Sequence, residues 1–203
     1  MRRFSRFLVF SISCLAATLL MSQTVQDNKQ IVQDVVQKYW TMEINGGRLT
    51  ADGWVRANAF FAHAVARPLN FSIAVIYDDS EPWPPEIKQN KAEVIIGIGS
   101  VGQIGPDLHF TKTKPGIFFK EGLLLHVIQE NPPDKSAASA TVPPRWKIEK
   151  PGDLIWLNLS TAIRYVSDER DRTTNSAIKQ NAARTLTILR KLQANYRQQT
   201  QHK

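Results

Sequence analysis

Histidine is the residue type best suited to proton transfer or metal binding near neutral pH, and the chain carries four histidines. They stand far apart, with no i, i+4 pair and no H-x-H or H-E-x-x-H motif, so the sequence predicts no metal site. Among the four histidines His126 is the best candidate for a functional role, because it shares strand parity with Leu124 and Ile128. If this parity faces the inside of a curved sheet, the imidazole can act as a general base. Otherwise His126 is a hydrogen-bonded core residue or lies on the outer face.

A glycine motif formed by Gly97, Gly99 and Gly102 has the G-x-G-x-x-G spacing of a dinucleotide-binding turn. That turn works only where the third glycine opens a helix whose N-terminal amides face a pyrophosphate. Here a Gln-Ile-Gly-Pro turn follows instead, so a strongly bent strand explains the glycines better. The sequence therefore predicts neither a nucleotide site nor another cofactor.

Carboxylates and tyrosines are the remaining candidates for acid–base chemistry. The candidate carboxylates are Asp34 and Glu43 on the first predicted helix and Glu93 and Glu121 in the middle of predicted strands, since helix-dipole stabilisation explains Asp52 in the first turn of the second helix. The two on strands share parity with residues that look partly outward, and the two on the helix lie off its apolar stripe. Tyr39 and Tyr77 can each donate a hydrogen bond into a pocket. Without an acid partner such tyrosines indicate binding, so we expect no catalytic residue.

The elements that would hold these groups begin with two helices joined by Gly46-Gly47. Apolar residues occur in adjacent pairs every four positions over residues 31–40, which predicts a wide apolar stripe on the first helix. Asp27 is placed to cap its start, and glycine at the joint takes the left-handed conformation that ends a helix. Thr50 then caps the second helix, which Pro68 stops.

Apolar runs predict four strands after the helices. Their ranges are 71–77, 92–102, 117–130 and 145–149. Gly122 marks a bend or bulge in the third strand, and residues 78–90 form a polar surface loop. Beyond Pro151-Gly152 the pattern is helical, over 159–166 and 174–196. This order predicts an α+β fold, with N-terminal helices packed in a curved antiparallel sheet of four to six strands, plus a C-terminal helical extension.

Residues 1–23 have the layout of a secretory signal peptide, with three arginines, an apolar stretch and then small or polar residues. We expect cleavage and export to the periplasm or the cell exterior; an uncleaved membrane anchor is the alternative. The only cysteine, Cys14, lies in this segment, so the mature chain has no disulfide and no thiolate metal site. Residues 24–169 then form the α+β domain, and residues 170–203 form a basic amphipathic extension.

The C-terminal extension dominates the formal net charge of +8. Residues 170–203 hold eight Lys/Arg against Asp171 alone, whereas residues 23–169 hold 15 Lys/Arg against 17 Asp/Glu. The helix predicted over 174–197 combines these cations with an apolar stripe. It can pack on its own sheet, form a homodimer or another protein contact, or lie on an anionic membrane. Export and the nearly neutral body argue against nucleic acid as a partner.

Several stretches together resemble the nuclear transport factor 2-like superfamily, and most of all its uncharacterised secreted bacterial members. They are Tyr39-Trp40, Gly47-Arg48-Leu49-Thr50 with Gly53-Trp54, Phe60-Phe61, the strand AEVIIGIGSVGQI and the strand RWKIE. The resemblance covers about residues 26–166 and implies a cone-shaped, cystatin-like α+β fold. It implies no single activity, because the superfamily includes isomerases, dehydratases, epoxide hydrolases, cargo binders and proteins without known activity.

A pocket in such a fold would open between the two helices and the strand that carries His126. The side chains expected to line it are Tyr39, Trp40, Trp54, Phe61, Tyr77, His126 and Trp146. Aromatic residues at helical spacing more often form core, so we expect an exported domain that binds a small apolar ligand or a protein partner without catalysis. The alternatives are a pocket enzyme of the isomerase, dehydratase or hydrolase type, and an interaction protein that works through its basic C-terminal helix.

Overall fold

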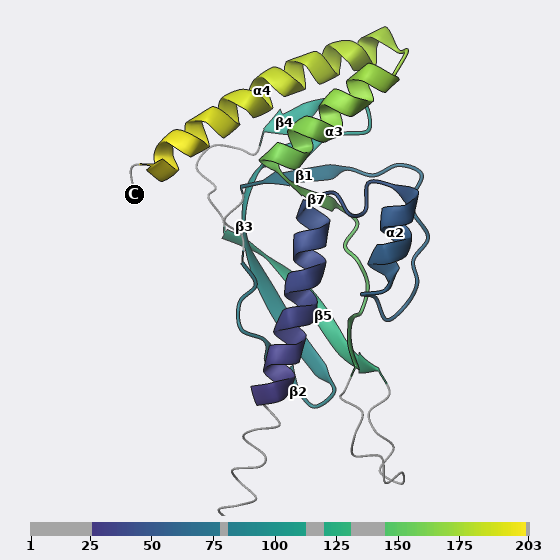
Figure 1. The fold of residues 1–203 in the computed structure, drawn as a ribbon, viewed down its shortest axis with the longest axis vertical. Helices are drawn as coiled ribbons and strands as arrows, with labels where there is room; N and C mark the ends of the chain where they lie inside the picture. Colours follow the sequence, from purple (N-terminus) through teal and green to yellow (C-terminus); the bar gives the residue numbers. More distant parts are fainter. Residues whose placement is uncertain (1–25, 78–80, 113–119, 131–144, 202–203) are drawn as a thin grey trace, which may run out of the picture.

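The structure is a computed structural model that describes residues 26–77, 81–112, 120–130 and 145–201, with the backbone alone for 120–122. Helices lie against one side of a curled sheet and at one of its ends (Figure 1). The predicted α+β fold is therefore confirmed. The predicted signal peptide lies outside the described residues.

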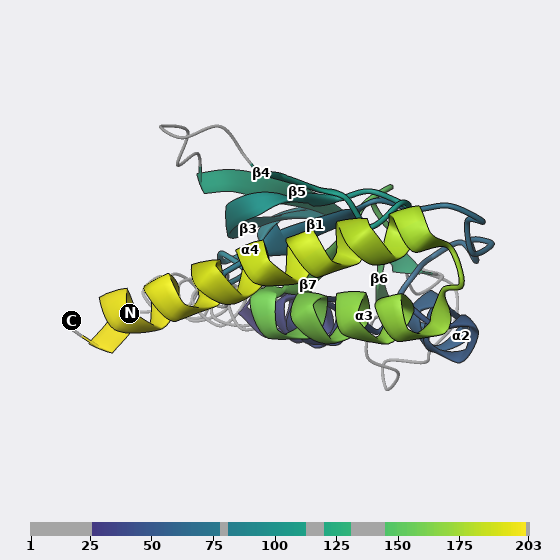
Figure 2. The ribbon, with the colours of Figure 1, turned by 90° about the horizontal axis from the view of Figure 1, so that it is seen from above.

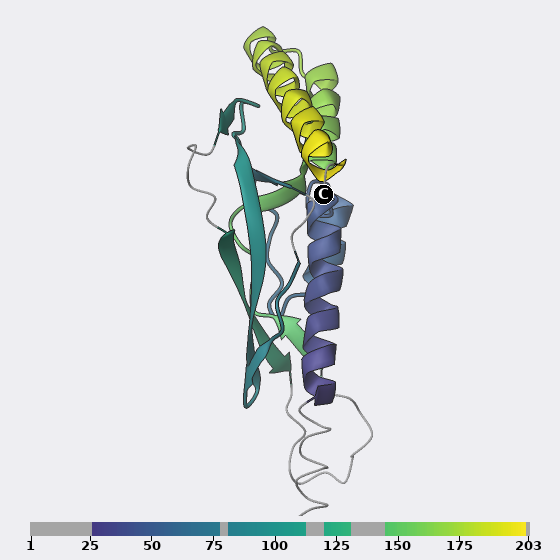
Figure 3. The ribbon, with the colours of Figure 1, turned by 90° about the vertical axis from the view of Figure 1, so that its left-hand side faces the viewer.

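The N-terminal helix, residues 26–44, lies along one face of the sheet (Figure 3). Its apolar stripe is buried as expected: Val32, Val36, Tyr39 and Trp40 all face the sheet. The helix ends at the predicted joint, where Gly46 has a φ of 87° and the Gly47 N–H donates to the Met42 carbonyl at 2.9 Å. Asp27 lies inside the helix, so its predicted role as the N-cap is wrong.

The second helix, α2 (Ala51–Asn58), is capped by Thr50 as predicted, with its hydroxyl accepting a 3.0 Å hydrogen bond from a first-turn N–H. It ends well before Pro68, so the predicted C-terminus is wrong. The Asn58 side chain gives the reason. Its Oδ1 accepts from the Val65 N–H at 3.1 Å and its amide donates to the Val65 carbonyl at 3.3 Å, which folds the chain back.

The sheet contains seven strands within the described residues. They are β1 (Ile73–Ile76), β2 (Glu86–Lys88), β3 (Lys91–Ile104), β4 (Phe110–Lys112), β5 (Lys120–Glu130), β6 (Arg145–Ile148) and β7 (Ile155–Asn158). Five form the main path in the order β6-β5-β3-β1-β7, while β2 and β4 pair with opposite ends of β3. Neighbours on this path are antiparallel except β1 and β7, which are parallel.

The sheet differs from the sequence-based expectation of an antiparallel sheet with four to six strands, because it has seven strands in the described residues and its β1–β7 pair is parallel. The sequence does not predict β7, because four residues are too few to show a pattern and Ile155 pairs with the remote Ile73. β2 lies inside the segment 78–90 that we expected to be a loop. The register between β3 and β5 is unbroken at Gly122, and the shift occurs instead between β1 and β3, at Val75/Ile76.

Two C-terminal helices, α3 (Leu159–Arg172) and α4 (Ser176–Gln201), lie side by side at one end of the sheet (Figure 2). α3 begins directly after β7, because the Asn158 side chain accepts a 2.8 Å hydrogen bond from a first-turn N–H. α4 is fixed to the segment before β4, since the Thr185 hydroxyl donates to the Leu108 carbonyl at 2.7 Å. No helix of the described part of the chain is both long and apolar enough to span a membrane.

The buried side chains form two clusters along the sheet, which we call the first core and the second core. The first core lies between the N-terminal helix and the β3–β5–β6 part of the sheet. The second core lies between α2, α3 and α4 and the part of the sheet made by β1, β7 and the end of β3. β1 and β3 contribute to both, with Ile76 and Ile96 in the first core and Val75 and Val101 in the second.

Candidate functional site

The seven predicted pocket residues do not gather around one space. Four are buried in the first core: Tyr39, Trp40, Phe61 and Trp146. Trp54 is buried in the second core, Tyr77 packs against that core, and His126 lies on the surface. The aromatic residues of this set therefore stabilise two separate cores, which is the ordinary role of large apolar side chains at helical and strand spacing.

The first-core aromatics contact one another and other buried groups. The Tyr39 ring meets the Phe61 ring edge-on, with 5.4 Å between centroids. Trp40 is 1% exposed, and the Trp146 indole N–H donates to the Asn28 side-chain oxygen at 3.5 Å. These side chains hold the N-terminal helix on the sheet.

Trp54 and Tyr77 perform similar packing roles in and beside the second core. The Trp54 indole N–H donates to the Val65 carbonyl at 2.6 Å, which fixes the segment after α2. The Tyr77 ring stacks on the Tyr196 ring with 4.6 Å between centroids and 17° between planes. Tyr77 therefore holds α4 against the end of β1 and does not face the first core.

His126 lies on the outer face of the sheet, so the expectation that it faces inward is wrong. Its neighbours Leu125 and Val127 are buried in the first core, and alternation along β5 turns His126 the other way. Its Nδ1 lies 3.9 Å from Oε1 of Glu93, directly opposite on β3, and both side chains are about half exposed. Because both side chains are exposed to water, the electrostatic interaction between them is weak, and the imidazole does not lie in an apolar pocket.

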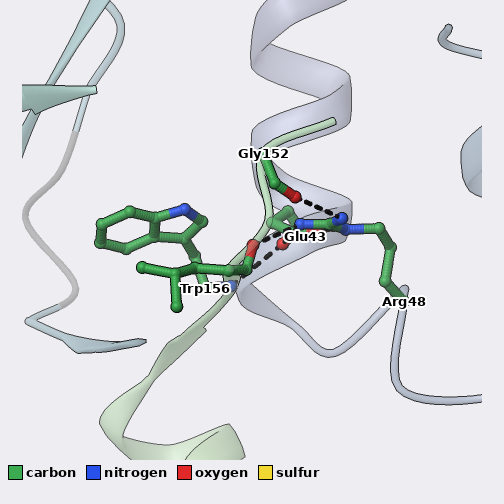
Figure 4. A network of polar contacts seen from close by, with 5 residues as sticks. Glu43, Arg48, Gly152 and Trp156 are labelled. Atoms are coloured by element: carbon green, nitrogen blue, oxygen red, sulfur yellow. Dashed lines mark hydrogen bonds and ion pairs between the residues drawn. The ribbon is translucent and has the colours of Figure 1, made fainter. Parts of the chain in front are cut away.

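A buried ion pair lies at the end of the N-terminal helix, where the sequence predicts no site (Figure 4). Arg48 Nε donates to Glu43 Oε2 and Arg48 Nη2 donates to Glu43 Oε1, both at 2.6 Å. The two side chains are 1% and 0% exposed. Glu43 Oε1 also accepts a 3.0 Å hydrogen bond from the Trp156 N–H of β7. Parallel bonds between a guanidinium and a carboxylate are the strongest geometry that such a pair adopts.

Arg48 makes two further hydrogen bonds and one contact with an aromatic ring. Nη2 donates to the Leu154 carbonyl at 2.6 Å and Nη1 to the Gly152 carbonyl at 3.2 Å, while the guanidinium lies 5.1 Å from the Trp54 ring centre. Burial acts to lower the pKa of Arg48, but hydrogen bonding to Glu43 and the charge of Glu43 outweigh it, so the pKa is raised. Arg48 therefore keeps its positive charge even though it is buried.

Tyr39 lies one turn before Glu43 and responds to the same charges. Burial raises the pKa of Tyr39 far above its usual value, the Glu43 carboxylate raises it further, and Arg48 opposes both. Tyr39 thus remains a neutral phenol, and Glu43 is already saturated by Arg48 and the Trp156 N–H. We interpret this network as a structural clamp that joins the helix joint to the segment leading into β7.

This clamp is not predicted from the sequence, because the helical periodicity of the apolar residues places Glu43 off the apolar stripe. Glu43 follows Tyr39 and Trp40 by four and three residues, so it continues their buried face by one turn. The available signal was an acid and a base on either side of Gly46-Gly47, close enough to pair across the turn. A polar residue at a buried position needs a partner, and Arg48 is the cation that stands directly across the glycine turn.

The outer face of β3 and β5 carries a group of exposed apolar side chains, which we call the outer patch: Trp83, Ile95 and Leu124. They are 50%, 38% and 44% exposed. Ile95 and Leu124 are direct cross-strand partners, and the Trp83 N–H donates to the Ile95 carbonyl at 2.7 Å. The Trp83 indole covers Gly97, whose position opposite Gly122 leaves a part of the sheet without side chains.

The other residues that the sequence offered as candidates for chemistry lie within regular strands or on the surface. Gly97, Gly99 and Gly102 all lie within β3 and open no helix, which agrees with the bent-strand interpretation. Asp34 is exposed and accepts a hydrogen bond from Gln30, and the side chain of Glu121 lies outside the described residues. No group of three or more potential metal ligands occurs among the residues that the structure describes.

Comparison of the chain with family models, with curated proteins and with solved structures finds no match in any of the three. Function is therefore argued from the residues alone.

Proposed function

We propose that this protein is an exported, non-catalytic domain of the nuclear transport factor 2-like type that binds a protein partner through the outer face of its sheet. The observation that carries the proposal is the outer patch of Trp83, Ile95 and Leu124, which is contiguous by strand register. Isolated apolar side chains on a surface are ordinary, but exposed apolar groups that touch one another are typical of interaction sites.

The interior offers less support for a small apolar ligand. The aromatic residues expected to line a pocket pack against one another in the first core or support the second core. Trp40 and Tyr39 are almost fully buried by protein atoms. A ligand that used this space would have to displace close-packed side chains, which costs free energy. A protein partner on the outer face needs no such displacement.

The surroundings of the outer patch indicate the chemistry of the partner. Lys91 and Glu93 lie on the same face of β3, and His126 lies opposite Glu93 on β5. The patch thus has an apolar centre with charges of both signs at its edge, the usual composition of a protein–protein interface. The Trp83 indole lies over Gly97, so the chain's own aromatic ring already covers this part of the sheet and belongs to the apolar centre of the patch. We infer a partner surface with one or two large apolar residues framed by charges.

The case against catalysis rests on the ionisable groups that the fold brings together. Glu43 and Arg48 are buried and saturated by each other, and Glu93 and His126 are open to water. Neither pair has the desolvated, accessible setting in which enzymes tune an acid or a base. Export and the superfamily assignment rest on the signal-peptide layout and on the quoted motifs, with which a curled α+β sheet is compatible.

The test places a photo-cross-linking amino acid at position 124 of the full chain, in cells that produce it. Val55 on α2 is the matched control, because it is 71% exposed and lies away from the outer patch. We expect a discrete cross-linked protein from position 124 and none from position 55. The identified partner is then titrated with purified chain. Leu124→Glu should weaken binding by about 30-fold, or about 2 kcal/mol, while Val55→Glu should leave it unchanged.

Two results would contradict this function. One is a partner that binds the Leu124→Glu variant as tightly as the original chain. The other is a small apolar molecule that is extracted in stoichiometric amount from the purified protein, with no cross-link at position 124. That second result would favour ligand binding in the interior.

A further inference from the structure

α4 has one face packed on the domain and one face in solvent. Its buried residues are Ala182, Thr185, Leu186 and Leu189, all in the second core or hydrogen-bonded beside it. The helix contains five cations and no acidic residue. All five are exposed: Lys179, Arg184, Arg190, Lys191 and Arg197. The basic residues therefore point away from the protein.

These cations lack carboxylate partners. None of the five forms an ion pair with another residue in the described ranges. Two of the three acids of α3 are engaged within their own helix, since Glu169 pairs with Arg172 and Asp171 with Arg170, and Asp168 forms no ion pair with a cation of α4 in the part of the chain that the structure describes. The five cations of α4 are thus exposed to solvent and form no ion pair with a carboxylate among the described residues, although Asp107 lies beside Asn181 of the same helix.

The exposed face has a fixed orientation. Thr185 is bonded to the Leu108 carbonyl, the Asn181 amide donates to the Asp107 carbonyl at 3.2 Å, and Tyr196 stacks on Tyr77. These contacts are distributed along the helix, and Figure 1 shows its C-terminal part extending past α3. α4 therefore cannot rotate its cations inward, and the basic face is a permanent surface of the fold.

The cations form two rows, because successive residues of an α-helix are separated by about 100°. One row contains Lys179, Arg190 and Arg197, and the other contains Arg184 and Lys191. The ridge between the rows has small exposed side chains, among them Ala183, Thr187 and Ala194. Long basic side chains on both sides of a low ridge can reach one flat surface together. The first row extends over about 27 Å at 1.5 Å per residue.

We propose that the exposed face of α4 docks on the anionic surface of a lipid membrane, with its five cations bound to headgroup phosphates. Charge complementarity identifies the partner as anionic, and the two-row arrangement favours an extended plane over a narrow rod. Ile188, 39% exposed and placed between Arg184 and Lys191 in the helical sequence, adds an apolar contact at the edge of this face. This surface is separate from the outer patch, so the inference does not depend on the proposed protein partner.

The test measures sedimentation of the full chain with vesicles of phosphatidylcholine containing about 30% phosphatidylglycerol, and with phosphatidylcholine alone. The apolar residues 7–21 can associate with either vesicle, so the readout is the difference between the two. We expect preference for the anionic vesicles, reduced by about 0.5 M salt because screening shortens the reach of surface charges. Each cation near an anionic surface contributes roughly fivefold in affinity. Neutralising Lys179, Arg190 and Arg197 to Gln should then weaken binding on the order of 100-fold.

A matched variant separates the helix face from total charge. Lys88, Lys112 and Lys150 are exposed cations elsewhere on the domain, and their replacement by Gln removes the same charge. The proposal requires this variant to keep the anionic preference. It is overturned if both triple variants lose affinity equally, or if the original chain shows no anionic preference. It is also overturned if heparin or duplex DNA binds much more tightly than the vesicles, which would identify another polyanion. Circular dichroism of each variant establishes that the fold is kept.

Discussion

Arg48 donates a 2.6 Å hydrogen bond to each carboxylate oxygen of Glu43, and the two residues lie on either side of the Gly46-Gly47 turn. The pair fixes more than this turn. Glu43 also binds the backbone N–H of Trp156, and Arg48 binds two carbonyl groups of the segment that precedes it. The end of the N-terminal helix is thereby attached to a strand near the other end of the domain.

Removal of one member of this pair should destabilise the fold strongly. Arg48→Met leaves the Glu43 carboxylate buried without its counter-charge, and we expect a loss of about 3–5 kcal/mol in the free energy of unfolding. Urea denaturation followed by tryptophan fluorescence measures it. The double variant Glu43→Leu/Arg48→Met should be more stable than Arg48→Met alone, because no unpaired charge remains. A loss in the double variant equal to the sum of the losses of Arg48→Met and Glu43→Leu would show that the pair is not coupled.

Alkaline pH should destabilise the protein through the partly buried Tyr165 and the buried Tyr39. Burial raises the pKa of Tyr165 to about 12, with the Glu169 charge adding to the shift and Arg67 opposing it. The folded state holds this proton more tightly than the unfolded state, where the pKa is 10.0. The stabilisation is therefore fully present below pH 10 and is lost as pH rises from about 10 to about 12. Tyr39 contributes in the same direction.

The comparison for this pH effect is Tyr165→Phe, which keeps the ring and removes the ionisable hydroxyl. Urea midpoints measured from about pH 8 to about pH 11.5 should fall less steeply for this variant than for the original chain. Lysine titration contributes equally to both proteins and cancels. Identical slopes would mean that the Tyr165 hydroxyl ionises equally in the folded and unfolded states.

Two glycines of β3, Gly99 and Gly102, should respond very differently to replacement by alanine. A Cβ at Gly102 would lie 2.5 Å from the Thr111 carbonyl oxygen and still closer to the Phe110 ring, so β4 would have to move. A Cβ at Gly99 would lie 3.5 Å from the Tyr77 ring, an ordinary contact. We expect Gly102→Ala to cost about 1–3 kcal/mol and Gly99→Ala to change stability by less than about 1 kcal/mol. Thermal or urea unfolding of both variants decides it, and a Gly99→Ala loss as large as that of Gly102→Ala would contradict the assignment.

Local features of the fold could be predicted from sequence because nearby residues determine them. The Gly46-Gly47 joint needs only a glycine that adopts positive φ, and the Thr50 cap needs only a hydroxyl beside free N–H groups. The strand over residues 92–102 could be predicted because buried and exposed positions alternate along its first part. β7 escaped prediction because its pairing with β1 depends on residues far away in the chain, which leave no local pattern.

Predictions about individual sites failed where they depended on which face of an element is covered. His126 does share a face with Leu124, as parity requires, but the opposite face, with Leu125 and Val127, is the buried one. Both faces of β5 contain apolar residues, so composition alone could not identify the interior. Glu43 is buried only because Arg48 returns across the turn to pair with it. Such a pairing is a property of the folded chain.

The second core is assembled from both ends of the domain, and this has a consequence for the timing of folding. Ile73 of β1 pairs with Ile155 of β7, and α4 is required to cover the cluster that they enter. Contacts of such large sequence separation close slowly, because loop entropy opposes them until the whole chain is present. During synthesis most residues of the first core can pack together before α4 has been made. The apolar side chains of Trp54 and β1, however, remain exposed until α4 has been synthesised and packs on the second core.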